Sequence, residues 1–151
     1  MDEMEQVLIQ EKNFDKARKE IRKNQGKIII FSGSRDELNR KILEKEQIDI
    51  LLLNQSDRKD KLKQRDSGFN QVLAKIAKKK NIAIGINLDE IISANSIQKA
   101  KILARVSQNI RLCNKNKLKM KFLAEKEKRD IYDIRALGIV LGMPTYMTKN
   151  L

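Results

Sequence analysis

Carboxylates are the residues in this sequence that most directly suggest a catalytic site. Aspartates stand near the ends of predicted strands, where a two-metal phosphoesterase would place its ligands; they are Asp49, Asp57, Asp60, Asp66 and Asp89. The chain contains no histidine, which excludes Ser-His-Asp triads, imidazole general bases and histidine-rich metal sites. Lysines and arginines are interleaved with the aspartates between residues 57 and 66, which is more typical of a mixed-charge surface loop. We therefore expect no catalytic residue and no bound metal, and keep a degenerate metal-dependent phosphoesterase as an alternative.

Glycine-rich phosphate-binding loops are also unsupported, because neither GxxxxGK[ST] nor GxGxxG occurs. Ser32-Gly33-Ser34 precedes a predicted helix start, whose free N–H groups could hold one anion. Ser34 and Glu37 have the spacing of a capping box, however, and a capped turn is the simpler interpretation.

The charge of the chain points to polyanions instead. Its 151 residues include 33 Lys plus Arg and 20 Asp plus Glu, so the net charge is +13. A domain this basic is expected to attract nucleic acid through many weak phosphate contacts, although a solubilising lysine-rich surface would give the same composition. With four Phe and two Tyr, recognition of folded RNA by shape and backbone is favoured over base stacking. The candidate RNA-binding residues are Arg58, Lys59, Arg65, Lys75, Lys78, Lys79, Lys80, Lys101, Arg105, Arg111, Lys117 and Lys119.

Hydrophobic patterning predicts a single α/β domain over residues 1–151. Short apolar runs at 27–31, 48–53 and 82–88 are typical of strands buried on both faces. Between residues 117 and 122, lysines alternate with apolar residues, which predicts a fourth strand at a sheet edge or lining a hydrated concavity. The remaining expected elements are a lead helix at 2–25, helices at 34–45, 66–77, 96–114 and 130–141, a turn at 89–93 and a loose tail at 144–151.

Alternation of strands with helices predicts a mainly parallel sheet wound in right-handed βαβ units. The polar stretch 54–65 follows a strand, at the edge where parallel α/β proteins bind ligands. Asp66 or Ser67 is expected to cap the next helix. Three apolar stripes are expected to face the core: Phe69, Val72, Leu73 and Ile76; Leu103, Val106, Ile110 and Cys113; and Ile131, Ile134, Leu137 and Leu141.

The cellular environment is predicted from what the sequence lacks. Cys113 is the only cysteine, so no intrachain disulfide forms, and its place in an apolar stripe predicts an inert core residue. No stretch has the roughly 20 apolar residues needed to span a bilayer, and the acidic start MDEMEQ does not read as a secretory signal. We expect a cytoplasmic protein.

The segment from Arg65 to Leu88, RDSGFNQVLAKIAKKKNIAIGINL, resembles the hallmark segment of archaeal ribonuclease P protein component 3. Its Asp66-Ser67-Gly68 loop and Asn70 precede an apolar helix and a strand, as in that family. Further similar stretches are IDILLL before it, AKILAR at 100–105 and IYDIRALGIVLGM near the end. The resemblance spans roughly residues 26–143.

The resemblance implies a TIM-barrel-like fold related to metal-dependent phosphoesterases but without their metal centre. Four predicted strands against the eight of a complete barrel imply a shortened or incomplete one. It also implies a protein subunit of the RNA-based enzyme that removes the 5′ leader from precursor tRNA. Such a subunit would contact the ribonuclease P RNA, protein component 2 and the other protein subunits, while the RNA holds the catalytic Mg²⁺. Gln71 stands where the family usually has histidine. A basic scaffold that binds a protein partner is a further alternative.

Overall fold

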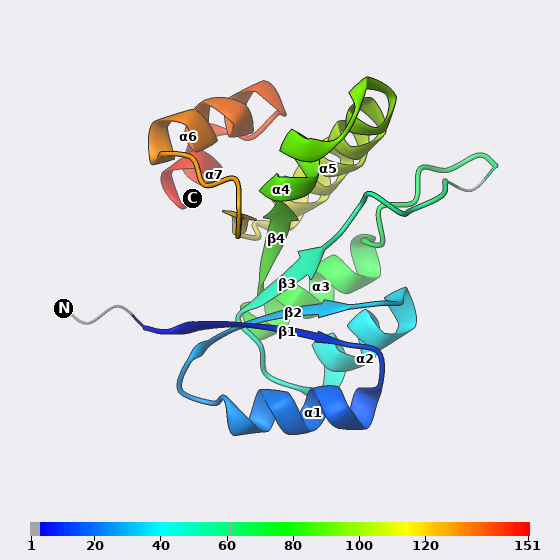
Figure 1. Ribbon diagram of the computed structural model, residues 1–151, viewed down its shortest axis with the longest axis vertical. Helices are drawn as coiled ribbons and strands as arrows, with labels where there is room; N and C mark the ends of the chain where they lie inside the picture. The colour runs from blue at the N-terminus through cyan, green and yellow to red at the C-terminus, as the bar shows by residue number, and fades with distance from the viewer. Residues whose placement is uncertain (1–3, 61) are drawn as a thin grey trace.

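The computed structural model describes residues 4–60 and 62–151 and is built on a five-stranded parallel sheet (Figure 1). The strands are β1 (Gln6–Glu11), β2 (Ile28–Gly33), β3 (Ile50–Leu53), β4 (Ala83–Asn87) and β5 (Met120–Leu123). They pair in chain order, each parallel to the next, with helices between them. The prediction of a parallel α/β sheet is confirmed, and the edge position predicted for the lysine-rich strand is confirmed for β5.

Helices connect successive strands, and two more follow the last strand (Figure 1). They are α1 (Phe14–Lys23), α2 (Asp36–Lys45), α3 (Gln71–Lys80), α4 (Leu88–Ser93), α5 (Ser96–Asn116), α6 (Ile131–Val140) and α7 (Thr145–Lys149). The main core lies between α1, α2, α3 and α5 and one face of the sheet, where Phe31, Leu51 and Ile84 are fully buried. Alternate strand residues point to the other face, and there Ile30, Ile50 and Leu52 form a second, smaller cluster. No helix in the described part of the chain is long and apolar enough to cross a membrane.

The predicted lead helix is wrong, because residues 6–23 form a strand followed by a helix; residues 2 and 3 lie outside the described residues. In β1, Ile9 enters the core while Gln6 and Gln10 are exposed. Asn13 then caps α1, and its side chain accepts from the N–H groups of residues 15 and 16 at 2.9 and 3.2 Å. The β1 alternation is too short to stand out beside the strong helical pattern of α1.

Three further predictions about local structure differ from what is observed. The Ser34–Glu37 capping box does not form, since α2 begins at Asp36 with no side-chain cap bond. The expected turn at 89–93 is helix α4, capped by Asn87. The expected loose tail contains α7, which buries Met147 and Thr148.

The three apolar stripes predicted to face the core are only partly buried. Leu73, Val106, Ile110 and Cys113 are buried, whereas Val72 is 51% exposed and Ile131 is 37% exposed. Cys113 lies in the core as predicted, and burial raises the pKa of its thiol to about 12.

Asp89 secures the connection between β5 and α6. Its carboxylate accepts the backbone N–H groups of Glu125 at 2.9 Å, Lys126 at 3.3 Å and Glu127 at 2.8 Å. Burial alone would raise the pKa of Asp89, but these hydrogen bonds to its ionised form lower it overall.

Stability should therefore depend on pH through Asp89. A folded-state pKa below the unfolded value means that the carboxylate contributes its full stabilisation above about pH 4 and loses it as the pH falls through the folded pKa. Asp89→Asn should be destabilising near pH 7, and its difference from wild type should shrink as the pH falls toward 3. Urea unfolding at several pH values measures this, and a pH-independent difference would contradict it.

Candidate nucleic-acid interface

Arg105 anchors the long loop between β3 and α3 to helix α5. Its guanidinium donates to the carbonyls of Gln55 at 3.0 Å and Arg58 at 2.9 Å, and to the Asp60 carboxylate at 3.1 Å. The side chain is only 2% exposed. Arg105, a candidate RNA-binding residue from the sequence, is therefore buried, and its Nε, Nη1 and Nη2 atoms all donate to the loop instead of facing solvent.

Arg58 is also held within the protein. It forms an ion pair with Asp36 from the start of α2, lies 3.5 Å from Asp66, and donates to the carbonyl of Asn54 at 3.1 Å. Its side chain is 18% exposed. Arg58 thus joins α2 to the loop, and its donors are directed at protein carboxylates rather than at solvent.

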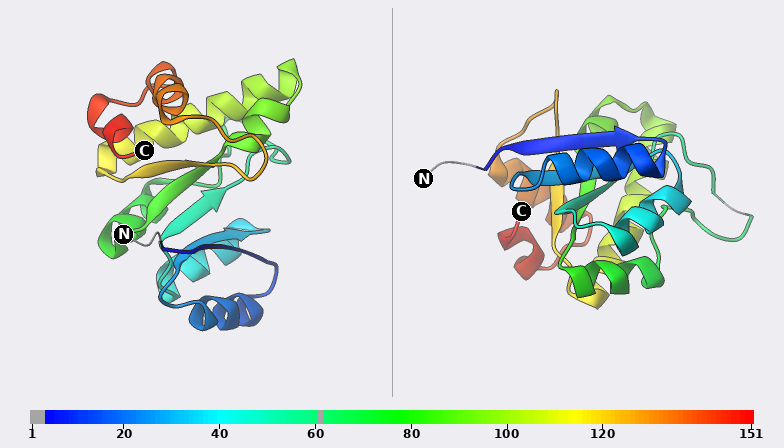
Figure 2. Two further views of the ribbon diagram at one scale, coloured as in Figure 1. Left: turned by 60° about the vertical axis from the view of Figure 1, so that its left-hand side comes forward. Right: turned by 90° about the horizontal axis from the view of Figure 1, so that it is seen from below.

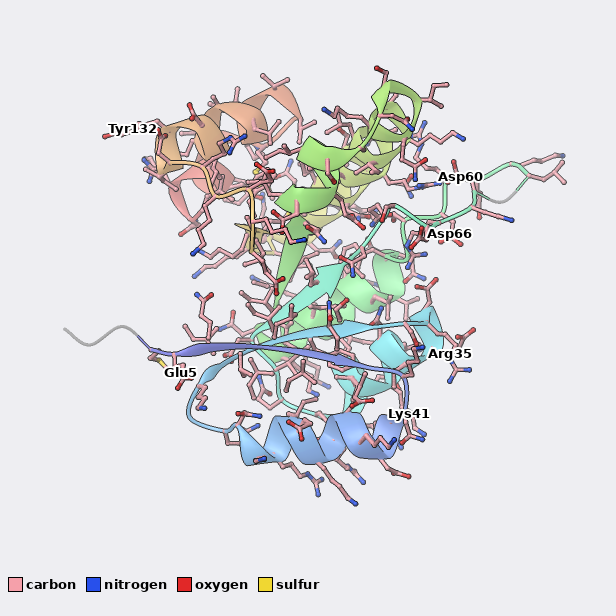
Figure 3. The ribbon with its side chains drawn as sticks, in the orientation of Figure 1. Glu5, Arg35, Lys41, Asp60, Asp66 and Tyr132 are labelled. Carbon is pink, nitrogen blue, oxygen red and sulfur yellow. The ribbon has the colours of Figure 1, made fainter. Side chains whose placement is uncertain are left out.

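The Asp66-Ser67-Gly68 segment and Asn70 shape the end of this loop. Asp66 accepts the N–H of Gly68 at 3.1 Å, and its own N–H donates to Asp60 at 2.9 Å; Figure 3 shows both carboxylates on the projecting loop. Buried Ser67 donates to the side chain of Asn109 on α5 at 2.6 Å. Asn70, rather than Asp66 or Ser67, is the N-cap of α3 and accepts from the Leu73 N–H at 3.0 Å. The hallmark segment therefore positions α3.

Gly68 meets two constraints at once. Its φ is +75°, and an added Cβ would lie 2.0 Å from Nη2 of Arg58. Gly68→Ala should lower the free energy of unfolding by about 1–3 kcal/mol, since it combines backbone strain with displacement of the guanidinium. Gly142→Ala is the matched control, because Gly142 has a φ of +110° with no atom near the added Cβ. Urea denaturation should show the greater loss at Gly68; equal losses would contradict the role of the Arg58 contact.

Predicted basic residues at the end of α3 meet those at the end of α5. Lys78 donates to the carbonyl of Lys117 at 3.0 Å, which brings the end of α3 against the end of α5. Lys117 closes α5 in the left-handed conformation. We call the exposed basic residues of α3 and of the end of α5 the α3–α5 basic face; they are Lys75, Lys78, Lys79, Arg111, Lys115 and Lys117. Lys119 is exposed too, but it directly precedes β5 at the edge of the sheet. Within residues 4–60 and 62–151, none of them forms an ion pair with a carboxylate. Lys115 is absent from the sequence-based candidates.

The other candidate RNA-binding residues lie outside the α3–α5 basic face. Lys80 donates to the carbonyls of Leu43 and Glu46, both at 2.8 Å, so it caps the end of α2. Burial lowers the pKa of Lys80, and nearby Glu46 and Glu44 oppose that effect. Lys59 and Arg65 are exposed on the loop and Lys101 is exposed on α5. A hollow of about 770 Å³ lies beside the loop, and Arg65 and Arg40 line it together with acidic residues of α2.

The aspartates that suggested metal chemistry have other partners. Asp49 accepts the N–H of Ile29 at 2.7 Å, Asp60 and Asp66 hold the loop, and Asp89 holds the connection after β5. Hydrogen bonding from the Asp66 N–H is the main cause that lowers the pKa of Asp60, with Arg105 adding to it. In the part of the chain that the structure describes, no three His, Cys, Asp or Glu side chains gather as a metal site would require. The phosphoesterase alternative therefore gains no support from this geometry.

Parallel strands in chain order, helices on one face and a polar loop at the strand ends define the class: an open, shortened TIM-barrel-like α/β protein. A family model described as RNase P subunit p30 matches residues 6–151. The chain belongs to this family, as the hallmark segment predicted.

Similar proteins agree with this assignment. Ribonuclease P protein component 3 of Methanococcus maripaludis (strain C7) is 26% identical over 147 residues, covering 96% of this chain and 60% of that protein. The Methanocaldococcus jannaschii protein of the same name is 28% identical over 131 residues, 84% of this chain and 54% of its own length. A chain in a cryo-EM structure of archaeal Ribonuclease P with mature tRNA superposes with a TM-score of 0.78 and 26% identity, covering 97% of this chain and 63% of that one. The chain thus spans about three fifths of the length of these relatives.

Proposed function

We propose that this chain is an RNA-binding protein subunit of ribonuclease P that supports the catalytic RNA in removing the 5′ leader from precursor tRNA. The observation that carries the proposal is the match of nearly the whole fold to a chain of an archaeal ribonuclease P. The α3–α5 basic face supplies the surface, because its lysines and arginines project to solvent without carboxylate partners among the described residues.

The mechanism is electrostatic. Lysine and arginine side chains on this face neutralise phosphates of the folded ribonuclease P RNA and release counterions. The RNA holds the Mg²⁺ that performs hydrolysis, and the chain contributes no nucleophile. Precursor tRNA is contacted indirectly, and the cytoplasm is the expected compartment.

Two measurements test the proposal. Affinity for the cognate ribonuclease P RNA should fall steeply with salt, each phosphate contact adding about −0.7 to −0.9 to the log–log slope. Reconstituted precursor-tRNA cleavage should be faster with this chain than without it. A flat salt dependence would contradict the electrostatic mechanism, and unchanged cleavage would contradict the assignment as a functional subunit.

Helix α6 carries a second surface, which is suited to binding a protein partner. Its exposed apolar residues are Ile131, Tyr132, Ile139 and Val140, with exposed fractions of 37%, 76%, 60% and 81%. Tyr132 points away from the body of the molecule in Figure 3. Such a patch on a chain with 35% charged residues is typical of a protein-binding surface. We infer that it contacts ribonuclease P protein component 2.

Introducing a charge into the apolar surface of α6 tests this contact. Val140→Lys should weaken binding of component 2 by about tenfold or more, because it buries a charge at an apolar interface. Ile97→Lys is the matched control, since Ile97 is 74% exposed on α5. Isothermal titration calorimetry with recombinant component 2 distinguishes the two, and equal affinities would place the contact elsewhere.

A further inference from the structure

Both margins of the sheet are open. β1 pairs only with β2 and β5 only with β4, so each has one edge without a strand neighbour among the described residues. Figure 2 shows the two strands at opposite margins of the curved sheet. An all-parallel sheet normally has both faces covered, and eight strands close a TIM barrel.

Curvature brings the two margins to opposite sides of one hollow. Leu8 of β1 and Leu123 of β5 both line a space of about 340 Å³. Ile30 and Leu52 also line it and belong to the second apolar cluster, against which Leu8 and Leu123 are half-buried. Apolar surface that a closed barrel would cover is therefore still in contact with solvent.

The two edges differ in chemical character. β5 is preceded by Lys119 and contains Lys121, whose ammonium group reaches the carbonyl of Asn150. Lysines of this kind protect sheet edges from pairing with another chain. The first five residues of β1, Gln6 to Gln10, carry no charge and no proline, although 35% of the chain is charged. β1 is thus the less protected edge, since its one charged residue, Glu11, is the last of the strand.

The backbone groups available at β1 follow from its pairing. Ile28 N–H donates to the carbonyl of Glu5 at 2.9 Å. In a parallel ladder the residues of a strand alternate between its two neighbours, so Val7 and Ile9 bond to β2. Gln6, Leu8 and Gln10 then direct their N–H and C=O groups to the free edge.

We propose that the free edge of β1 accepts an extended segment of a second polypeptide, which adds as a parallel strand and places alternate apolar side chains over Leu8 and Leu123. The matching ribonuclease P chain contains further residues outside the matched region, which is 63% of its length, so polypeptide of this family is a candidate source of such a segment. A second copy of this chain is a poor occupant of the β1 edge. It would bring five strands with their helices to a gap that borders one small hollow. Two copies would also repel each other, because each has a net charge of +13. Strand addition of this kind is a recurrent mode of peptide recognition.

The test uses the full chain and a defined probe. The segments of Methanococcus maripaludis (strain C7) ribonuclease P protein component 3 that lie outside the matched 60% are made as fluorescent polypeptides and titrated into the protein. At least one should bind, and the amides of Leu8 and Gln10 should then exchange hydrogen about tenfold or more slowly. Fluorescence anisotropy and hydrogen exchange read out the two effects.

Gln10 offers a matched pair of variants. Gln10→Pro removes the N–H that faces the free edge and leaves the β1–β2 ladder intact, so it should weaken probe binding by about tenfold. Gln10→Ala keeps that N–H and should bind as wild type. Circular dichroism should show the same fold for both.

Several outcomes would overturn the proposal. They are failure of every segment to bind, equal affinities of Gln10→Pro and Gln10→Ala, or exchange protection confined to α6. A concentration-dependent dimer that protects Leu8 and Gln10 without any probe would overturn the choice of occupant. None of these results depends on RNA binding, so the proposed function is tested separately.

Discussion

Replacement of Arg105 by methionine is expected to lower the free energy of unfolding by about 2–5 kcal/mol, chiefly through the backbone carbonyls that lose their donor. Methionine replaces the apolar stem of the arginine side chain but lacks the guanidinium, whose donors satisfy the carbonyls of Gln55 and Arg58. Buried acceptors left without a partner cost about 1–3 kcal/mol each. The ion pair with Asp60 adds less, because the Asp60 side chain is 39% exposed and solvent screens it.

Lys101→Met is the control for this variant. Lys101 is exposed and lies one turn before Arg105 on the same helix, so its replacement should change stability by less than about 0.5 kcal/mol. Urea unfolding followed by circular dichroism measures both variants. Hydrogen exchange should also show that residues 54–70 lose protection first in Arg105→Met. Equal stabilities of the two variants would show that the loop does not depend on the arginine.

The burial of Arg105 was not predicted, although the sequence of α5 indicates it. Ile102, Val106 and Cys113 form the buried stripe of α5, and Arg105 and Asn109 fall at helical spacing within it. Two polar residues on an apolar stripe are a signal of a buried hydrogen-bond network, and the sequence contains it. The predicted stripe contained Leu103, which is only partly buried. With Leu103 on the buried face of the predicted helix, Arg105 falls on the exposed face.

Elements with strong local patterns could be predicted from the sequence. The continuous apolar runs of β2, β3 and β4 and the long pattern of α5 lie close to the predicted positions. β1 and α7 could not be predicted. β1 is not a continuous apolar run, α7 has only five residues, and both depend on tertiary contacts of Ile9 and Met147. Juxtaposition of Lys78 with Lys117 is a property of the packing of α3 on α5, which local patterns do not specify.

The α3–α5 basic face leads to the second large expected effect. The triple variant Lys75→Gln, Lys79→Gln and Lys115→Gln should reduce the steepness of the salt dependence of RNA binding by about 2–3 log–log units. These three side chains are exposed, so their loss should leave the fold unchanged. Affinity should fall by about 10²-fold or more at low salt, where phosphate neutralisation contributes most. Filter binding of the cognate ribonuclease P RNA between low and moderate salt gives both quantities.

Net charge alone could produce part of that loss, and α1 provides the comparison. Lys16, Lys19 and Lys23 are exposed on α1, away from α3 and α5 in Figure 1. Their replacement by glutamine removes the same three charges from +13, so it weakens long-range attraction equally. If the α3–α5 basic face contacts RNA phosphates, the α1 variant keeps most of the wild-type slope while the α3–α5 variant does not. Equal losses would mean that RNA responds to the overall field of the protein, and the contact surface would then have to be sought among Lys59, Arg65 and Lys101.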